Sequence, residues 1–280
     1  MTYTMRLLYV LISFTYLITA STTRADERIY TVAVAPQFAS IQVYRDWTPL
    51  LNKLEEQTGY HFKLLAYNDF SRFERDLWQG VPDLVYLNPY HMVIAKQKNK
   101  YRPLVRDSSP LSGILVVRKD SPIKSVKDLE GKTVAFPSPN ALGASLYIRA
   151  LFAEKYHIKI NPVYVGNHQN VYRHVLLGEA SAGGGVKQTL SKESENITSQ
   201  LDVLYKTPDI FPHPLAAHPR VPKEVSKKIV SSLLSLSTDQ VNNKLLTAIQ
   251  MPQLMEADYK HDYADLAQLK LDRYAEKQTQ

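Results

Sequence analysis

The residues best suited to bind a ligand follow two short apolar runs. Asn88 and Tyr90 come after the apolar run 84–87, and the sequence Pro-Ser-Pro-Asn at 137–140 comes after a second such run. Each run has the length of a buried strand and leads into a predicted helix. In open α/β sheets, ligands collect beyond the carboxyl ends of the strands. The sequence therefore predicts two polar edges that face each other across a cleft and hydrogen-bond a small ligand there.

The helix expected after the second run offers backbone donors. Asn140, or Ser138 in its place, has the side chain of an N-cap residue. The first N–H groups of a helix lack internal partners and carry the positive end of its dipole, so Ala141, Leu142 and Gly143 could bind an oxyanion through their amides. The alternative is an ordinary capped helix in solvent, because every helix has such an end.

Two further polar edges occupy comparable places. Asn167 and His168 follow the predicted strand 163–165, where a histidine can donate to an anion or titrate near neutral pH. Gln37 and Phe38 follow the first predicted strand, at the topologically equivalent position. The alternatives are a helix-capping or surface role for the histidine and loop packing for the others.

His213 and His218 are flanked by prolines. A metal site is not predicted, because their spacing matches no familiar ligand pattern and no carboxylate cluster accompanies them. His213 is instead retained as a candidate ligand contact. The glycines 183–185 either allow a close backbone approach or form a turn.

Composition narrows the function classes. The chain has no cysteine, which excludes disulfides, thiol nucleophiles, thiolate metal sites and attachment of lipid through cysteine. The formal net charge of +7 falls by two, to +5, without Arg6 and Arg24 of the predicted signal peptide. Lysine and arginine are scattered among acids, so we expect no nucleic-acid partner. No cofactor is predicted.

Residues 1–25 are predicted to be a secretory signal peptide, which implies a periplasmic protein. Arg6 precedes an apolar core at 7–18, and small residues follow at 19–25. The core is short for a membrane span, although an uncleaved anchor is the alternative.

The elements that must position these residues alternate between strands and helices, which is typical of an α/β fold. Strands are predicted at 30–35, 61–66, 84–87, 112–118, 133–136, 163–165, 180–184 and 201–206. Helices are predicted around 47–58, 70–78, 91–98, 142–156, 171–177, 223–236, 242–249 and 263–275.

The strand at 112–118 has no helix on either side, so it could carry the chain from one lobe to another. The stretch 201–206 could run back. We therefore predict a first lobe of residues 26–110 plus 208–280, a second lobe of residues 111–207, and a two-strand hinge. Each lobe is expected to be a mostly parallel sheet flanked by helices.

Five stretches together resemble the phosphate/phosphite/phosphonate-type periplasmic solute-binding proteins. The resemblance extends over roughly residues 28–220. It is carried in order by Tyr30–Pro36, Pro49–Glu55, Asp83–Tyr90, Ser121–Pro139 and Val165–His168. It implies the type II periplasmic-binding fold and a binding function without catalysis.

In that family a tyrosine after the third strand, hydroxyl residues at the start of a second-lobe helix and a histidine hold the oxyanion. Tyr90 and His168 match two of these positions, whereas the run 140–143 replaces the hydroxyl cluster. About three side-chain hydrogen bonds, each worth ~1–3 kcal/mol toward a charged group, are absent. Another oxyanion or a less charged molecule is as well matched as a phosphonate.

The sequence thus predicts a monomeric solute-binding protein that serves an ABC-type importer. The alternative is a protein that presents its ligand to a membrane sensor histidine kinase. An enzyme on the same fold is less expected, because there is no cysteine and because Asp83 and Glu179 lie away from the predicted cleft.

Overall fold

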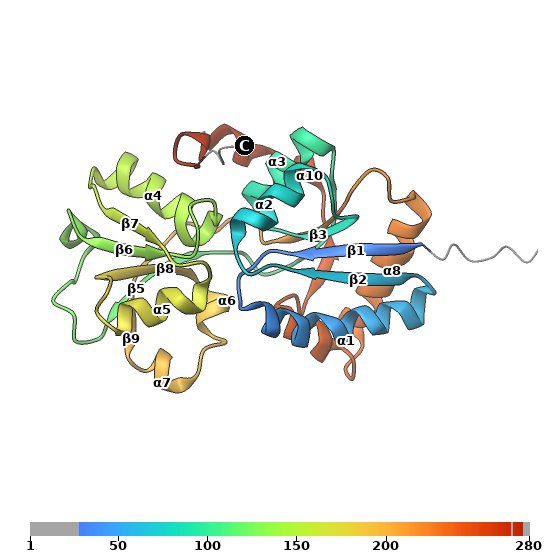
Figure 1. Cartoon of the computed structure of the whole chain (residues 1–280), viewed down its shortest axis with the longest axis horizontal. Coiled ribbons are helices and arrows are strands. Elements are labelled where there is room, and N and C mark those ends of the chain that lie inside the picture. Colours follow the sequence, from blue (N-terminus) through green and yellow to red (C-terminus); the bar gives the residue numbers. More distant parts are fainter. Residues whose placement is uncertain (1–27, 270, 277–280) are drawn as a thin grey trace, which may run out of the picture.

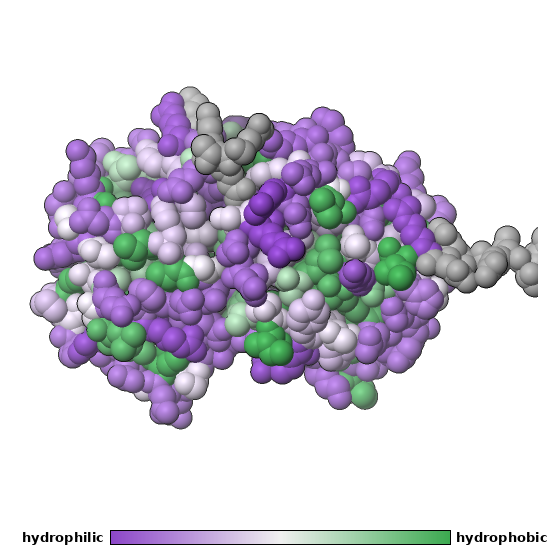
Figure 2. Space-filling model, viewed as in Figure 1, coloured by the Kyte–Doolittle hydropathy of each residue, from purple (hydrophilic) through white to green (hydrophobic). Residues whose placement is uncertain are grey.

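The computed structural model describes residues 28–269 and 271–276. The predicted signal peptide, 1–25, lies outside these residues. The chain forms two lobes that lie side by side, each built on one β-sheet (Figure 1). None of the helices in the described part of the chain is both long and apolar enough to cross a membrane. On the face drawn in Figure 2, hydrophobic residues occur in small groups among hydrophilic ones, as is usual for a protein surface.

The first lobe contains a six-stranded sheet in the order β11-β4-β10-β3-β1-β2. β1 pairs in parallel with β2 and β3, β10 runs antiparallel to β3 and β4, and β11 runs antiparallel to β4. The strands are β1 (Ile29–Val34), β2 (His61–Ala66), β3 (Leu84–Tyr86), β4 (Arg102–Asp107), β10 (Pro214–Ala217) and β11 (Leu254–Glu256).

Helices pack on both faces of this sheet. The buried side of α1 carries Trp47, Leu50, Leu51 and Leu54, and Gly59 ends the helix at a φ of 72°. One apolar cluster joins α1, α8 and α9 to the sheet, and another joins α2 and α3 to its other face. The helices are α1 (Ser40–Thr58), α2 (Phe70–Trp78), α3 (Pro89–Asn99), α8 (Lys223–Thr238), α9 (Asn243–Ala248) and α10 (Tyr259–Asp262).

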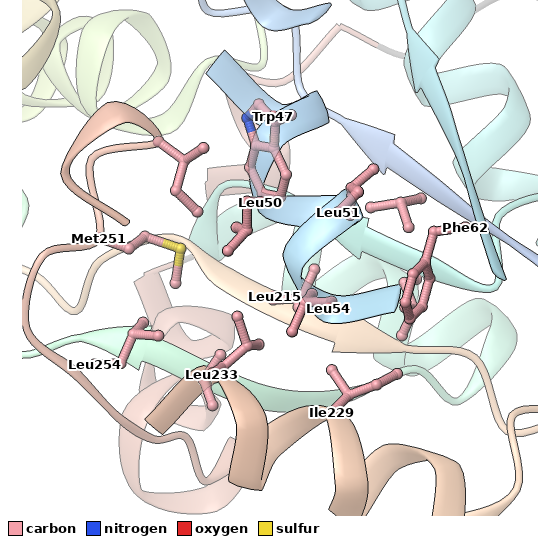
Figure 3. A pocket seen from close by; sticks show the side chains of 14 residues that line it. Trp47, Leu50, Leu51, Leu54, Phe62, Leu215, Ile229, Leu233, Met251 and Leu254 are labelled. Carbon is pink, nitrogen blue, oxygen red and sulfur yellow. The ribbon is translucent and has the colours of Figure 1, made fainter. Parts of the chain in front are cut away.

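A small cavity lies inside the first of these clusters. Side chains of α1 and α8 approach one another around it (Figure 3). Its volume is about 10 Å³ and its lining is wholly apolar. A bound water needs about this much space and also needs polar partners, which this cavity lacks. We therefore regard the cavity as part of the packed apolar core and not as a binding site.

The second lobe contains a five-stranded sheet in the order β7-β6-β8-β5-β9. β6 is parallel to β7 and β8, whereas β5 is antiparallel to β8 and β9. The strands are β5 (Gly113–Arg118), β6 (Thr133–Phe136), β7 (Asn161–Tyr164), β8 (Ala182–Val186) and β9 (Leu201–Lys206). The helical elements are η1 (Val126–Leu129), η2 (Leu142–Leu146), α4 (Tyr147–Leu151), η3 (Phe152–Tyr156), α5 (His168–Leu176), α6 (Lys187–Leu190) and α7 (Glu195–Thr198).

The two sheets are joined by residues 108–112 and 207–213, which pair with each other. Leu111 and Ile210 exchange backbone hydrogen bonds of 2.8 and 2.9 Å. The amide of Gly113 also donates to Thr207 Oγ1 at 2.9 Å. The chain therefore passes from the first lobe to the second before β5, and β5, which we predicted as the connecting strand, belongs to the second sheet.

Both sheets contain parallel and antiparallel pairs. They are therefore less parallel than the mostly parallel sheets that the alternation of strands and helices predicted.

The C-terminal segment differs from its prediction. In place of a helix over 263–275, the chain forms two short 3₁₀ turns, η4 (Ala264–Leu269) and η5 (Leu271–Arg273). Leu271 is buried with Leu142, Leu146 and Ala150 of the second lobe. The segment leaves α10 in the first lobe and ends beside α4 (Figure 1). Its apolar residues therefore pack against partners in both lobes, whereas the apolar residues of a single helix would share one face.

Asp83, which precedes β3, has a structural role. Its carboxylate accepts hydrogen bonds from Arg28 at 3.0 Å, Arg220 at 2.6 Å and the Thr31 amide at 2.9 Å. These contacts tie β1, β3 and the residues after β10 together, as charge-assisted hydrogen bonds do.

Candidate functional site

The two predicted polar edges meet directly between the lobes. Asn88 caps α3, because its Oδ1 accepts a hydrogen bond from the His91 amide at 2.8 Å. Its Nδ2 donates to the main-chain oxygen of Asn140 at 3.1 Å. Asn88 lies at the carboxyl end of β3, and Asn140 lies in the turn after β6. The structure therefore places both edges at one interlobe contact.

Asn140 does not cap the following helix, and neither does Ser138. The first turn of that helix, η2, begins after Ala141 without a side-chain cap. Asn140 Nδ2 instead donates to Glu74 Oε2 at 3.2 Å and to the main-chain oxygen of Glu276 at 3.1 Å, and its Oδ1 accepts from the Glu276 amide at 3.1 Å. The N-cap prediction was wrong, because partners from the first lobe and the C-terminal segment bind this side chain.

The residues at the start of η2 are covered. Leu142 and Leu146 belong to one buried apolar cluster, and Tyr90 of the first lobe packs against this cluster. Burial, with the nearby carboxylates of Glu74 and Asp272, raises the pKa of Tyr90 to about 12. Gly143 is buried too, and its carbonyl approaches Gly113 so closely that a Cβ there would lie 2.0 Å away. Tyr90 thus makes an apolar contact between the first lobe and the cluster that η2 forms with Leu271.

His168 lies at the start of α5, where Asn167 caps the helix by accepting from the Asn170 amide at 3.0 Å. The His168 amide donates across the cleft to the Gln37 carbonyl at 3.2 Å. Its ring Nδ1 lies 3.2 Å from Thr189 Oγ1, which itself donates to Val186 O at 2.9 Å. Thr189 Oγ1 also lies 2.7 Å from the Tyr172 hydroxyl, so the ring of His168 belongs to a buried hydrogen-bond network. Burial lowers the pKa of His168 to about 3, so the ring is neutral.

A cavity of about 320 Å³ lies beside these contacts, and we call it the cleft cavity. Both lobes line it. The first lobe contributes the segments after β1 and α9 and the residues around β3 and β10, and the second lobe contributes the end of β8 and α6. Its polar lining includes Gln37, Tyr86, Gln188, Lys192, His213 and Gln250.

His213 stacks on Tyr86 inside the cleft cavity, with ring centroids 5.4 Å apart and planes at 25°. Burial, and then the nearby rings of His168 and His91, lowers the pKa of His213 to about 3. The ring is therefore neutral at physiological pH and offers one donor and one acceptor. His213 and Gln37 are the predicted site residues that line this cavity.

The remaining predicted residues have other surroundings. Phe38 is buried and lies under the Lys192 ammonium group, which is 5.5 Å from the ring centroid. Ser138 is buried, and its Oγ has no hydrogen-bond partner among the described residues. Within the same residues, no group of three or more His, Asp or Glu side chains could hold a metal ion.

The glycines 183–185 lie within β8 rather than after it, and their role is packing. A Cβ on Gly184 would lie 1.9 Å from the Ala144 carbonyl oxygen, and one on Gly185 would lie 2.4 Å from the Tyr172 hydroxyl. The close approach that these glycines permit is therefore to η2 and α5.

Sequence reasoning missed Tyr86, Gln188, Lys192 and Gln250. Tyr86 looks like one more residue of a buried strand, and the other three stand in polar segments without a motif. The one local signal is at Gln250, which follows a predicted helix at the place where glycine or asparagine is common.

Two lobes, each built on one mixed sheet, with a cavity lined by both, are the architecture of the type II periplasmic-binding fold. The family model described as "ABC transporter, phosphonate, periplasmic substrate-binding protein" matches residues 32–263, so this chain belongs to that family. The predicted family, fold class and periplasmic solute-binding function are confirmed. The members are substrate-binding proteins of transporters and not enzymes, and the family's location is the periplasm.

Solved structures with the same fold come from several bacteria. The binding protein component of an ABC phosphonate transporter from Pseudomonas aeruginosa has a TM-score of 0.78 at 17% identity, covering 89% of this chain and 87% of that one. PhnD1 from Prochlorococcus marinus, in complex with methylphosphonate, has a TM-score of 0.79 at 16% identity, covering 89% and 99%. The periplasmic VFT2 domain of BvgS from Bordetella pertussis has a TM-score of 0.55 at 20% identity, covering 81% and 94%.

Proposed function

We propose that this protein captures a small polar solute between its lobes and presents the closed form to an ABC-type permease. The observation that carries the proposal is the cleft cavity, which takes polar side chains from both lobes. A solute held there gains contacts from the second lobe only when the lobes are together. Such differential contact is what allows a ligand to shift a conformational equilibrium.

The hinge in this mechanism consists of residues 108–112 and 207–213. Two short segments can absorb a rotation of one lobe against the other. The C-terminal segment 264–276 must move with this rotation or separate from η2, because it contacts the second lobe. We propose lobe boundaries of 26–110 plus 208–280 for the first lobe and 111–207 for the second. Leu271, near the end of the first of these ranges, packs against the second lobe.

An oxyanion such as phosphonate or phosphate is the first ligand class to test. The solved PhnD1 structure holds methylphosphonate, and His168 and Tyr90 of this chain match the family pattern. In the present arrangement, however, the turn at 140–143 is covered by Tyr90 and by the bonds of Asn140. An anion there would require these contacts to separate.

The experiment combines thermal unfolding with small-angle X-ray scattering, using the mature chain with and without methylphosphonate, phosphate and neutral solutes. A ligand that binds the folded state raises Tm by mass action. We expect the effective ligand also to reduce the radius of gyration. If Tm rises while the scattering profile stays the same, closure is not the response to the ligand. Tyr90→Ala should weaken binding of an oxyanion at the turn; equal affinity would remove Tyr90 from the site.

A sensor histidine kinase is the second candidate partner, and the absence of the hydroxyl cluster at 140–143 favours it. Pull-down from membranes with the closed, ligand-bound protein distinguishes the two partners. Recovery of a permease with its ATPase supports import, and recovery of a kinase supports sensing. We propose that the protein acts as a monomer, which light scattering after gel filtration would test.

A further inference from the structure

Three polar side chains that line the cleft cavity make no hydrogen bonds within the protein. Gln37, Tyr86 and His213 are only 5%, 5% and 8% exposed. None of these three side chains makes a hydrogen bond to any residue that the structure describes. Their polar atoms are not among the fully buried atoms without a partner, so they open onto the cavity. Gln188 Oε1, which also lines the cavity, is fully buried and has no hydrogen-bond partner among the described residues. Because buried polar groups are almost always hydrogen-bonded, these side chains together point to a polar molecule that occupies the cavity.

The lining also lacks an available charge. Lys192 donates to the Ala248 carbonyl and lies 3.5 Å from Asp46 Oδ2. Asp107 accepts from the amides of Ser109 and Gln253, each at 2.8 Å. No other residue lining the cavity in the described chain is a lysine, arginine, aspartate or glutamate. A doubly charged anion would therefore lose its hydration without meeting an unpaired cation, which is unfavourable.

We propose that the cleft cavity binds a small molecule without net charge that is rich in hydroxyl or amide groups. The proposal rests on the proposed capture between lobes and names the ligand class. Three carboxamides, those of Gln37, Gln188 and Gln250, offer both donors and acceptors to such a ligand. The stacked pair of Tyr86 and His213 provides a flat wall. A volume of about 320 Å³ is suited to a molecule the size of a monosaccharide.

The backbone at Gln250 supports this assignment. Gln250 follows α9 with a φ of 66°, a left-handed conformation that residues with a side chain rarely adopt. Glycine is the usual residue at such a helix end. Strained residues of this kind are often found at ligand contacts, and here the strained residue is a glutamine that lines the cavity.

The test uses D-ribose, D-glucose and N-acetyl-D-glucosamine as neutral probes, with methylphosphonate and phosphate as anions. Binding is measured by Tm and calorimetry, and closure by scattering. Gln250→Gly removes the side chain while relieving the backbone, and Gln37→Ala removes a second carboxamide. Lys100→Gly is the matched control, because Lys100 ends α3 at a φ of 61° on the exposed surface, away from the cavity.

We expect at least one neutral probe to bind and each glutamine variant to weaken it by about threefold to tenfold, the effect of one neutral hydrogen bond. Lys100→Gly should bind as wild type does. The proposal is overturned if the anions alone bind, if no neutral probe binds, or if both glutamine variants retain wild-type affinity. Binding of an anion alone, with contraction of the protein, would reject the ligand class and leave capture between the lobes intact. Variant-sensitive binding of a neutral probe without contraction would support the cavity and reject closure.

Discussion

The side-chain amide of Asn88 donates to the main-chain oxygen of Asn140, 3.1 Å away, and so joins the carboxyl end of β3 in one lobe to the turn after β6 in the other. Asn88 also caps α3 through its Oδ1. One residue therefore begins a helix and connects the lobes. The two functions can be separated, because capping needs a short side chain and the interlobe bond needs a longer one.

Asn88→Ser should keep the cap and lose the interlobe bond, because serine is a good N-cap residue with a shorter reach. We expect a Tm close to that of wild type and a larger radius of gyration without ligand. Asn88→Ala loses both functions and should lower the free energy of unfolding by a further ~1 kcal/mol. Identical scattering from Asn88→Ser and wild type would show that this bond does not hold the lobes together.

Gly184→Ala should be far more destabilising than Gly178→Ala. A Cβ at Gly184 would meet a backbone oxygen at 1.9 Å, so β8 and η2 must separate, at a cost of about 3 kcal/mol or more. Gly178 has open space around it and a φ of 75°, so its substitution costs only the left-handed strain of ~1–2 kcal/mol. Chemical denaturation measures both values. Gly184 does not have a positive φ, so equal effects would mean that β8 and η2 accommodate the added methyl group at little cost.

The spacing of apolar residues along the sequence was sufficient to predict most of the alternating strands and helices of the first lobe. The apolar face of α1 and the glycine that ends it can be read from neighbouring residues, and both are observed. β10 could not be predicted in this way. It has four residues that begin with Pro214, and it is a strand because β3 and β4 pair with it from distant parts of the sequence.

The site shows the same limit. Tyr90 and His168 could be proposed as ligand contacts because they follow predicted strands, but neither lines the cleft cavity. Gln188 and Gln250 come from α6 and the end of α9, and the fold alone brings them to one cavity. The role of Asn140 was mispredicted for a related reason, since its partners Glu74 and Glu276 are remote in sequence.

Stability should fall as the pH drops from 6.5 toward 3. His168 and His213 have folded-state pKa values of about 3, against an ordinary value of 6.5. Between these values the unfolded chain binds more protons, so lowering the pH favours unfolding. Each buried histidine should remove on the order of 2 kcal/mol at pH 5. Denaturation at pH 7 and pH 5 measures the loss, and His213→Gln should reduce it. Equal stability at the two pH values would contradict the neutral, buried state of both rings.

Lys192 should hold the lobes together as a latch. It belongs to the second lobe, yet its ammonium group donates to the Ala248 carbonyl and lies 3.5 Å from Asp46, both in the first lobe. Lys192→Met keeps an apolar stem against Phe38 and removes these polar contacts. We expect a larger radius of gyration without ligand, because an equilibrium between open and closed lobes responds to the loss of contacts made only in the closed form. The free energy of unfolding should change by no more than ~1 kcal/mol, since the ion pair is only partly buried.

The matched control for the latch is Lys187→Met, which removes an exposed lysine from α6 in the same lobe. The two variants have the same net charge, so any general effect of charge on the scattering is common to both. Expansion in Lys192→Met alone identifies the contact with Ala248 and Asp46 as its cause. If the two variants give the same scattering profile, the Lys192 contacts do not hold the lobes together. The closed arrangement then depends on the apolar contact between Tyr90 and η2 and on the hydrogen bonds of Asn140. In that case, the double variant Lys192→Met with Asn88→Ser should have the same radius of gyration as Asn88→Ser alone.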